Sequence, residues 1–315
     1  MTDSLSLDVL MACPLLDDLS AWIESEHNAT RLWEQSDRAA FLAAHGARFE
    51  VLATTGAIGA DKALIDALPN LRLIASFGVG VDPIDVDAVR ARGIAVTNTP
   101  GVLNACVADL ALGLLLALAR RIAEGDRFVR AGQWTSRRLP FGTALGGKRC
   151  GIVGMGGIGR EIAKRVSACG MRVAYHGPRR KADLDFPFHD SLVGLASESD
   201  VLVLALPGGD ATRHIVNAQV LDALGPRGMF VNVARGSVVD EHALVDALNS
   251  GALGGAALDV FEHEPNVPAS LRALDNVVLA PHSGSATVET RFAMGDLVRR
   301  NIDAFAHGAP LVTPL

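Results

Sequence analysis

Short apolar runs ending in Gly, Pro or Asn alternate with helical patterns along most of the chain. This alternation is typical of parallel β-sheets covered by helices on both faces. Two sets of runs occur: DVLMA, FEVLATT, LRLIASF and IAVTN in the first third, then RCGIVG, RVAYH, VLVLALP, MFVNVA, GAALDV and NVVLAP from about residue 148. The sequence therefore predicts an α/β protein with two doubly wound parallel sheets, and a run of six strands suits one dinucleotide-binding unit.

Length and composition agree with two domains. The chain has 315 residues, of which 49% are hydrophobic and 20% charged, the ordinary profile of a globular protein. Its formal net charge of -6 argues against a nucleic-acid or membrane-surface binder, so any anion site must be local. The longest nearly uncharged apolar run, at 110–119, is too short to span a bilayer.

The cysteines and the N-terminus indicate a reducing compartment. The four cysteines are scattered without CxxC spacing and lie in apolar surroundings: Cys13, Cys106, Cys150 and Cys169. The N-terminus carries Asp3 and Asp8 and no early base, which is unlike a signal peptide, and LSLDVLMA is typical of a first strand. We therefore expect a cytoplasmic protein.

Two long helices are expected outside the alternating pattern. Apolar residues recur at helical spacing across 107–119: Val107, Leu110, Ala111, Leu114, Leu115 and Leu118. This buried helix could join the domains. A second amphipathic helix, TRFAMGDLVRRNIDAFAHG, places Phe292, Leu297, Ile302 and Phe305 on or near one face and is expected to return to the first domain.

A glycine-rich turn in GIVGMGGIGREIA follows a strand and opens a helix. Gly154, Gly156 and Gly159 have GxGxxG spacing, with Gly157 and Ile158 between them. The first glycine permits a tight turn, the second lets the backbone approach a pyrophosphate, and the third allows close packing of helix on strand. The spacing alone is weak evidence, but its position between strand and helix predicts dinucleotide binding.

The second strand of this unit lacks the acid that usually binds the adenosine ribose. That position falls at His176 in RVAYHGPRRK, where Arg179, Arg180 and Lys181 follow. A carboxylate would repel a 2′-phosphate, whereas these residues would attract it, so NADP(H) is the expected cofactor. The alternative is an ordinary solvated basic turn.

Three later strands are followed by polar side chains. NVARGSVVDE supplies Arg235, LDVFEHEP supplies Glu264 and APHSGSAT supplies His282. Each alone has a structural explanation, as a paired turn arginine, an exposed acidic loop or a structural histidine. Because open α/β sheets bind ligands beyond the carboxyl ends of their strands, we expect all three beside the cofactor.

With these segments the chain resembles the D-isomer-specific 2-hydroxyacid dehydrogenase family, most closely its glyoxylate/hydroxypyruvate reductase branch. The resemblance rests on FGVGVDPID, VTNTPGVLNACVADLALGLLLALARR, LGGKRCGIVGMGGIGREIA and nearly everything from 227 to 287. It implies a Rossmann cofactor domain, 101–286, inserted in a flavodoxin-like substrate domain formed by 1–100 and 287–315.

The resemblance also implies catalytic roles that suit the residue types. Reduction of a 2-keto acid adds hydride to the carbonyl carbon and a proton to its oxygen, and His282 is suited to donate that proton. Glu264 is the carboxylate partner that stabilises its imidazolium. Arg235 can grip the substrate carboxylate and polarise the carbonyl with a planar fork that lysine lacks. The N–H groups of Val79 and Gly80 complete the grip in the family.

Further cofactor contacts are implied by the same resemblance. Asp259 corresponds to the family's acid near the nicotinamide carboxamide, and Ala234 offers a main-chain carbonyl to the same ring. Pro207 and Thr212 lie in PGGDATRHIV, where the family commonly has bulkier residues at positions 208 and 209. The cofactor wall is therefore expected to be looser there or to make a different contact. No metal site is expected.

Composition and one further segment bear on the substrate and on oligomerisation. One tyrosine and three tryptophans in the chain favour small polar substrates such as glyoxylate and hydroxypyruvate. By the resemblance AGQWTSRRLPFG (131–142) corresponds to a dimer arm of the family, and this arm together with the apolar helix at 107–119 predicts a homodimer. Arg137 and Arg138 lie in the arm, where solvated surface charges are the more common outcome. Two other functions stay open: an NAD(P)H-sensing binding protein of the same fold, and a dehydrogenase for another small substrate, such as phosphite.

Overall fold

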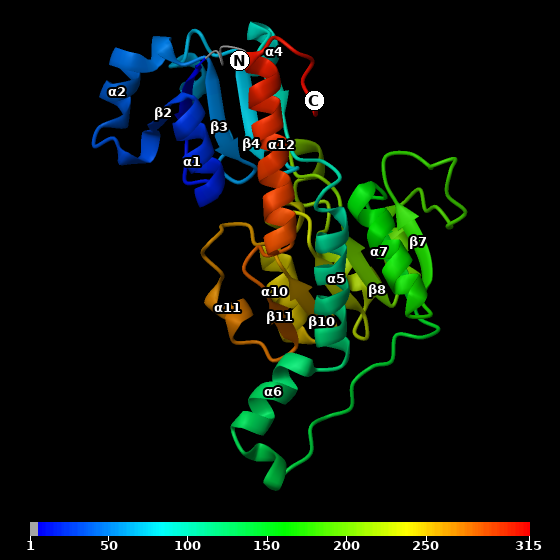
Figure 1. Ribbon diagram of the computed structural model, residues 1–315. Helices are drawn as coiled ribbons and strands as arrows, with labels where there is room; N and C mark the ends of the chain where they lie inside the picture. The colour runs from blue at the N-terminus through cyan, green and yellow to red at the C-terminus, as the bar shows by residue number, and fades with distance from the viewer. Residues whose placement is uncertain (1–5) are drawn as a thin grey trace. The chain divides into compact units, whose positions relative to one another are not determined.

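The computed structural model describes residues 6–315, so residues 1–5, with Asp3, lie outside the described part of the chain. Contacts divide the chain into two compact units (Figure 1). One unit runs to Leu103 and resumes at Ala286, and the other is Asn104–Ser285. No helix within residues 6–315 is long and apolar enough to cross a membrane.

The Asn104–Ser285 unit contains a parallel sheet of six strands in the order β11-β10-β9-β8-β6-β7. They match the six expected runs: β6 (Arg149–Val153), β7 (Arg172–His176), β8 (Val201–Leu204), β9 (Met229–Asn232), β10 (Gly255–Leu258) and β11 (Val277–Leu279). From β6 the chain first builds outward to β7 and then returns to place β8 on the other side of β6. The carboxyl ends of β6 and β8 therefore form the switch point at which such sheets bind ligands.

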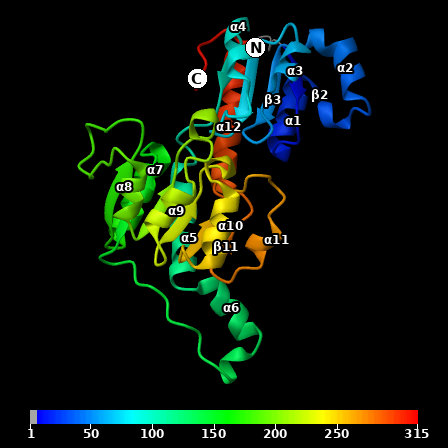
Figure 2. The ribbon, with the colours of Figure 1, turned by 180° about the vertical axis from the view of Figure 1, so that it is seen from behind.

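Helices cover both faces of this sheet (Figures 1 and 2). One face carries α5 (Asn104–Ala119) and α7 (Gly157–Ala168), which pack against each other. The other carries α8 (Leu192–Ser197), α9 (Ala218–Leu224) and α10 (Glu241–Ser250). The remaining helices of the unit are α6 (Ile122–Arg130) and α11 (Ala269–Arg272). The apolar run of α5 is thus explained by contacts with α7, β9, β10 and β11.

The other unit contains a parallel sheet of five strands in the order β2-β1-β3-β4-β5. Four match the expected runs: β1 (Asp8–Met11), β3 (Val51–Thr55), β4 (Leu73–Phe77) and β5 (Ala95–Thr97). The fifth, β2 (Asn28–Arg31), has the sequence NATR and was not expected. It pairs only with β1 at the sheet edge, so it needs no apolar run.

Five α-helices within residues 6–315 belong to this unit. They are α1 (Asp17–Glu26), α2 (Arg38–His45), α3 (Lys62–Asp66), α4 (Val86–Arg92) and α12 (Val288–Ala306). The tail helix α12 contacts β4 and α1, as expected for a helix returning to the first part of the chain. Its buried stripe, however, includes Met294, Leu297, Val298 and Ile302, whereas Phe292 is 54% exposed. The expected placement of Phe292 on that face is wrong, because the 3.6-residue period carries position 292 off the stripe.

Candidate active site

The glycine-rich turn joins β6 to α7 at the switch point. Gly154 has φ +94°, and a Cβ there would lie 2.6 Å from the Ala205 carbonyl oxygen that follows β8. A Cβ on Gly159 would lie 2.1 Å from the Gly154 carbonyl oxygen. Packing therefore requires glycine at both positions.

The middle of the turn is open. Gly156 is exposed, and a Cβ on it would meet nothing within 4 Å, so bare backbone faces solvent immediately before α7 begins at Gly157. Ile158 lies in the first turn of that helix. A bare backbone leading to free helix N–H groups is the surface a pyrophosphate needs, so the residues present fit a dinucleotide.

The basic turn after β7 is folded back on its own strand. His176 Nδ1 lies 2.8 Å from the His189 carbonyl oxygen, which requires a proton on Nδ1 and leaves Nε2 available. The Lys181 N–H donates to the Tyr175 hydroxyl at 2.7 Å. These bonds fix both ends of the turn that carries the basic residues.

The two arginines at the tip of this turn are exposed. Within residues 6–315, the side chains of Arg179 and Arg180 form no hydrogen bond or ion pair. Beside them, Arg160 of α7 forms a two-pronged pair with Asp183, at 2.8 and 3.1 Å. The turn thus presents two uncommitted guanidinium groups, while a third cation is occupied by an acid.

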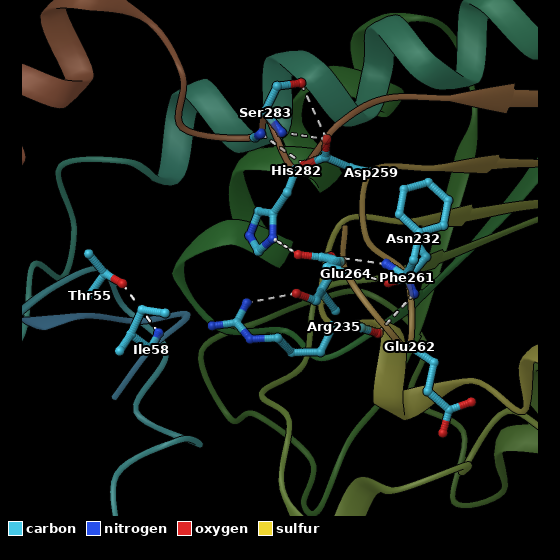
Figure 3. A network of polar contacts seen from close by, with 12 residues as sticks. Thr55, Ile58, Asn232, Arg235, Asp259, Phe261, Glu262, Glu264, His282 and Ser283 are labelled. Carbon is cyan, nitrogen blue, oxygen red and sulfur yellow. Dashed lines mark hydrogen bonds and ion pairs between the residues drawn. The ribbon is translucent and has the colours of Figure 1, made fainter. Parts of the chain in front are cut away.

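His282 and Glu264 form a direct pair (Figure 3). His282 Nδ1 lies 2.7 Å from Glu264 Oε2, and the Phe261 N–H donates to Glu264 Oε1 at 3.0 Å. Burial raises the pKa of Glu264, but the His282 and Phe261 hydrogen bonds and the charge of Arg235 outweigh it and hold that pKa below its ordinary value. Glu264 is therefore an anion at neutral pH, and Nδ1 is the donor in the pair. The other ring nitrogen, Nε2, is left for a ligand, and the side chain is 42% exposed.

Asp259 holds the backbone that presents His282. The carboxylate accepts the N–H groups of Ser283 at 2.7 Å and Gly284 at 2.8 Å, and the Asp259 carbonyl accepts the His282 N–H at 2.8 Å. His282 has φ +49°, which is strained for a residue other than glycine. Burial raises the pKa of Asp259, although these bonds oppose it. The structure therefore gives Asp259 a second task, which its sequence position did not reveal.

Arg235 lies in a short loop after β9 and is half-buried. Its Nη1 donates to the Ala234 carbonyl oxygen at 2.8 Å. Asn232, 1% exposed, donates through its side chain to the Arg235 carbonyl at 2.9 Å and accepts the Ala234 N–H at 3.0 Å. Asn232 was missed by sequence reasoning, and its only signal is an amide at the end of an otherwise apolar strand.

The loop after β8 is closed on itself. The Thr212 hydroxyl donates to the Pro207 carbonyl oxygen at 2.9 Å, and Gly209 has φ +117°. Glycine at position 209 is thus required by the backbone of this loop.

Val79 and Gly80 lie in the unit formed by both chain ends, in the turn after β4. Asn98 donates to the Val79 carbonyl oxygen at 2.9 Å, which fixes the turn. Within residues 6–315 neither the Val79 nor the Gly80 N–H donates to a protein acceptor. Both N–H groups are available to a ligand. The described residues contain no group of three or more His, Cys, Asp or Glu that could hold a metal ion.

The structure thus places a glycine-rich turn at the switch point of a parallel sheet, and a hydrogen-bonded histidine–glutamate pair and an arginine beyond the same sheet. This arrangement is typical of nucleotide-dependent dehydrogenases. Residues 112–284 match the model of the D-isomer specific 2-hydroxyacid dehydrogenase NAD binding domain. The chain is 47% identical to a glyoxylate/hydroxypyruvate reductase of Arabidopsis thaliana over 98% of its length and 99% of the relative's. It is 46% identical to a hydroxyphenylpyruvate reductase of Plectranthus scutellarioides with the same coverage.

A solved structure shows the same fold. An NADPH-dependent glyoxylate/hydroxypyruvate reductase from Sinorhizobium meliloti, in complex with NADP and malonate, aligns with a TM-score of 0.92 at 41% identity, covering 98% of this chain and 96% of that one. The chain belongs to the D-isomer-specific 2-hydroxyacid dehydrogenase family, in agreement with the resemblance seen in the sequence.

Proposed function

We propose that the protein reduces small 2-keto acids, glyoxylate and hydroxypyruvate above all, to 2-hydroxy acids with NADPH. The observation that carries the proposal is the 2.7 Å pair of His282 and Glu264 beyond the strand ends of the sheet that bears the nucleotide turn. Relatives named as glyoxylate or glyoxylate/hydroxypyruvate reductases support the substrate class.

The dinucleotide-binding role belongs to Asn104–Ser285 and the substrate-binding role to the other unit. The N–H groups beyond Gly156 would hold the pyrophosphate of NADPH, which when bound would supply hydride to the carbonyl carbon. His176, Arg179 and Arg180 bind the 2′-phosphate. Support for NADPH comes from the uncommitted arginines and from the NADP-bound relative.

The protein's own side chains handle the proton and the carboxylate. Glu264 keeps a proton on Nδ1 of His282. In the imidazolium form Nε2 carries a second proton, which it donates to the carbonyl oxygen, and in the reverse direction Nε2 of the neutral ring accepts that proton. Arg235 binds the substrate carboxylate and polarises the carbonyl. The N–H groups of Val79 and Gly80 hold the same carboxylate, and Pro207, Thr212, Ala234 and Asp259 border the cofactor.

The protein is also proposed to act as a cytoplasmic homodimer. The helix α6 and the chain after it expose apolar side chains: Ile122 (56%), Val129 (54%), Trp134 (71%) and Phe141 (102%). Several exposed apolar side chains within one segment of the chain favour a protein partner, here a second copy of the chain. Free cysteines at all four positions suit a reducing compartment.

A second substrate class has specific support. The hydroxyphenylpyruvate reductase is almost as similar to this chain as the glyoxylate/hydroxypyruvate reductase is, so an aromatic 2-keto acid must be tested beside the small ones.

A panel of 2-keto acids with NADPH and with NADH tests the proposal, with loss of reduced cofactor absorbance as the measurement. We expect the highest kcat/KM for glyoxylate or hydroxypyruvate with NADPH. A preference for 4-hydroxyphenylpyruvate would replace the substrate, and a preference for NADH would reject the role of the basic turn. NADPH binding without turnover of any keto acid would favour a sensing protein instead.

A further inference from the structure

Glu262 is a carboxylate near the active site that none of the roles above uses. Its side chain is only 10% exposed, and its Oε1 accepts hydrogen bonds from Arg213 Nη2 at 2.9 Å and His214 Nε2 at 2.7 Å. A nearly buried carboxylate with a guanidinium and an imidazole on one oxygen is a strong, geometrically specific contact. Such a contact between two loops fixes their separation.

One of the two loops carries proposed cofactor-binding residues and the other carries Glu264. Arg213 and His214 directly follow the loop of Pro207 and Thr212, after β8. Glu262 directly follows Phe261, whose N–H holds Glu264 Oε1 at 3.0 Å. Figure 3 shows the Glu262 side chain pointing away from His282, so Glu262 cannot itself reach the reacting atoms in this arrangement.

The backbone at His214 has an uncommon conformation. His214 has φ +49°, a conformation that costs a residue other than glycine or asparagine free energy. Besides the bond to Glu262, the His214 N–H donates to the Ser237 carbonyl oxygen at 2.9 Å. These two bonds hold the strained residue in place.

We propose that Glu262, Arg213 and His214 form a brace that positions the Glu264–His282 pair. Glu262 fixes the Phe261 peptide, the Phe261 N–H fixes Glu264, and Glu264 fixes the imidazole of His282. All three are positioning residues. The inference rests on the proposed roles of Glu264 and His282.

Other charged groups face the brace and the pair. The Glu241 carboxylate on α10 accepts the Glu262 N–H at 3.3 Å and thus adds a second acid beside Glu262. Arg235 and Asp259 act on the pair itself, as described above. Removing the charge of Glu262 replaces its charge-assisted hydrogen bonds with Arg213 and His214 by weaker neutral ones, while Glu241 is unchanged.

Glu262→Gln is the main test, with Asp296→Asn as the control. Asp296 pairs with Arg299 on α12, in the other unit and on the surface. We expect Glu262→Gln to lower kcat for keto-acid reduction about tenfold, since small displacements of catalytic groups reduce rates strongly. KM and the NADPH dissociation constant should change less than twofold.

Two further variants separate positioning from general damage. Arg213→Lys retains a cation and should recover most of the lost kcat relative to Arg213→Met. His214→Asn tolerates the left-handed backbone but cannot place a donor where Nε2 lies, so it should behave like Glu262→Gln. Should Glu262→Gln not fold, these Arg213 and His214 variants carry the same test.

A spectroscopic measurement tests the brace without relying on turnover. The proton between His282 Nδ1 and Glu264 should give a low-field ¹H NMR signal, assigned by its loss in Glu264→Gln. We expect this signal to disappear or broaden in Glu262→Gln and to persist in Asp296→Asn. An unchanged signal together with a control-like kcat would overturn the brace. An inactive wild-type protein would instead reject the proposed function, with the NMR comparison still deciding the brace.

Discussion

The His282–Glu264 pair and the basic turn after β7 lie in the same unit but differ in how many contacts hold their side chains. Around His282, contacts with Glu264 and Asp259 fix both the ring and the backbone. At the basic turn, Arg179 and Arg180 have no side-chain partner among residues 6–315. The difference fits the roles proposed for the two regions: proton transfer demands a fixed geometry, whereas a phosphate with several oxygens can be bound by exposed cations.

The largest expected effect comes from removing the side chain of His282. His282→Ala should lower kcat for keto-acid reduction by a factor on the order of 10²–10⁴, because the proton donor is lost. NADPH affinity, measured by fluorescence titration, should stay close to that of the wild type. Full activity in the variant would remove His282 from the mechanism.

Arg235→Lys tests whether the planar geometry of the guanidinium group matters in addition to its charge. Lysine keeps the cation but lacks the planar fork, so we expect kcat/KM to fall about 100-fold, with KM rising and kcat falling together. Steady-state kinetics over a range of glyoxylate concentrations measure both. A change confined to KM would limit Arg235 to substrate binding.

Arg179→Ala and Arg180→Ala test the role of the basic turn after β7. Each lost contact with a 2′-phosphate should weaken NADPH affinity about ten- to 150-fold, equivalent to roughly 1.5–3 kcal/mol. The NADH dissociation constant should barely change, since NADH has no 2′-phosphate. Equal losses for both cofactors would contradict the assignment, and His282→Ala serves as the matched variant with an intact turn.

The smallest expected effect concerns the ion pair between Arg160 and Asp183 near the basic turn. Asp183→Asn should change NADPH affinity only about two- to fivefold, because exposed ion pairs contribute little. Isothermal titration at low and high salt measures it. A change as large as that of Arg179→Ala would show that the turn is preorganised, like the His282–Glu264 pair.

Much of this arrangement was predictable from the sequence. The alternating runs gave all six strands of one sheet and four of the five in the other, and the family was recognisable from the segments around Arg235, Glu264 and His282. The exceptions are instructive: β2 lacks an apolar run, and Phe292 has the right residue type at the wrong angle around α12.

Residue type and spacing along the chain determined the fold class, the nucleotide turn and the kinds of side chain at the strand ends, because hydrophobic periodicity and glycine conformation act over a few neighbouring residues. Only the tertiary structure decided which polar atoms meet. Asp259 reaches Ser283 and Gly284, and Glu262 reaches Arg213 and His214, across long stretches of chain. Such contacts depend on the order of strands in the sheet and on the path of each loop, which no local pattern specifies.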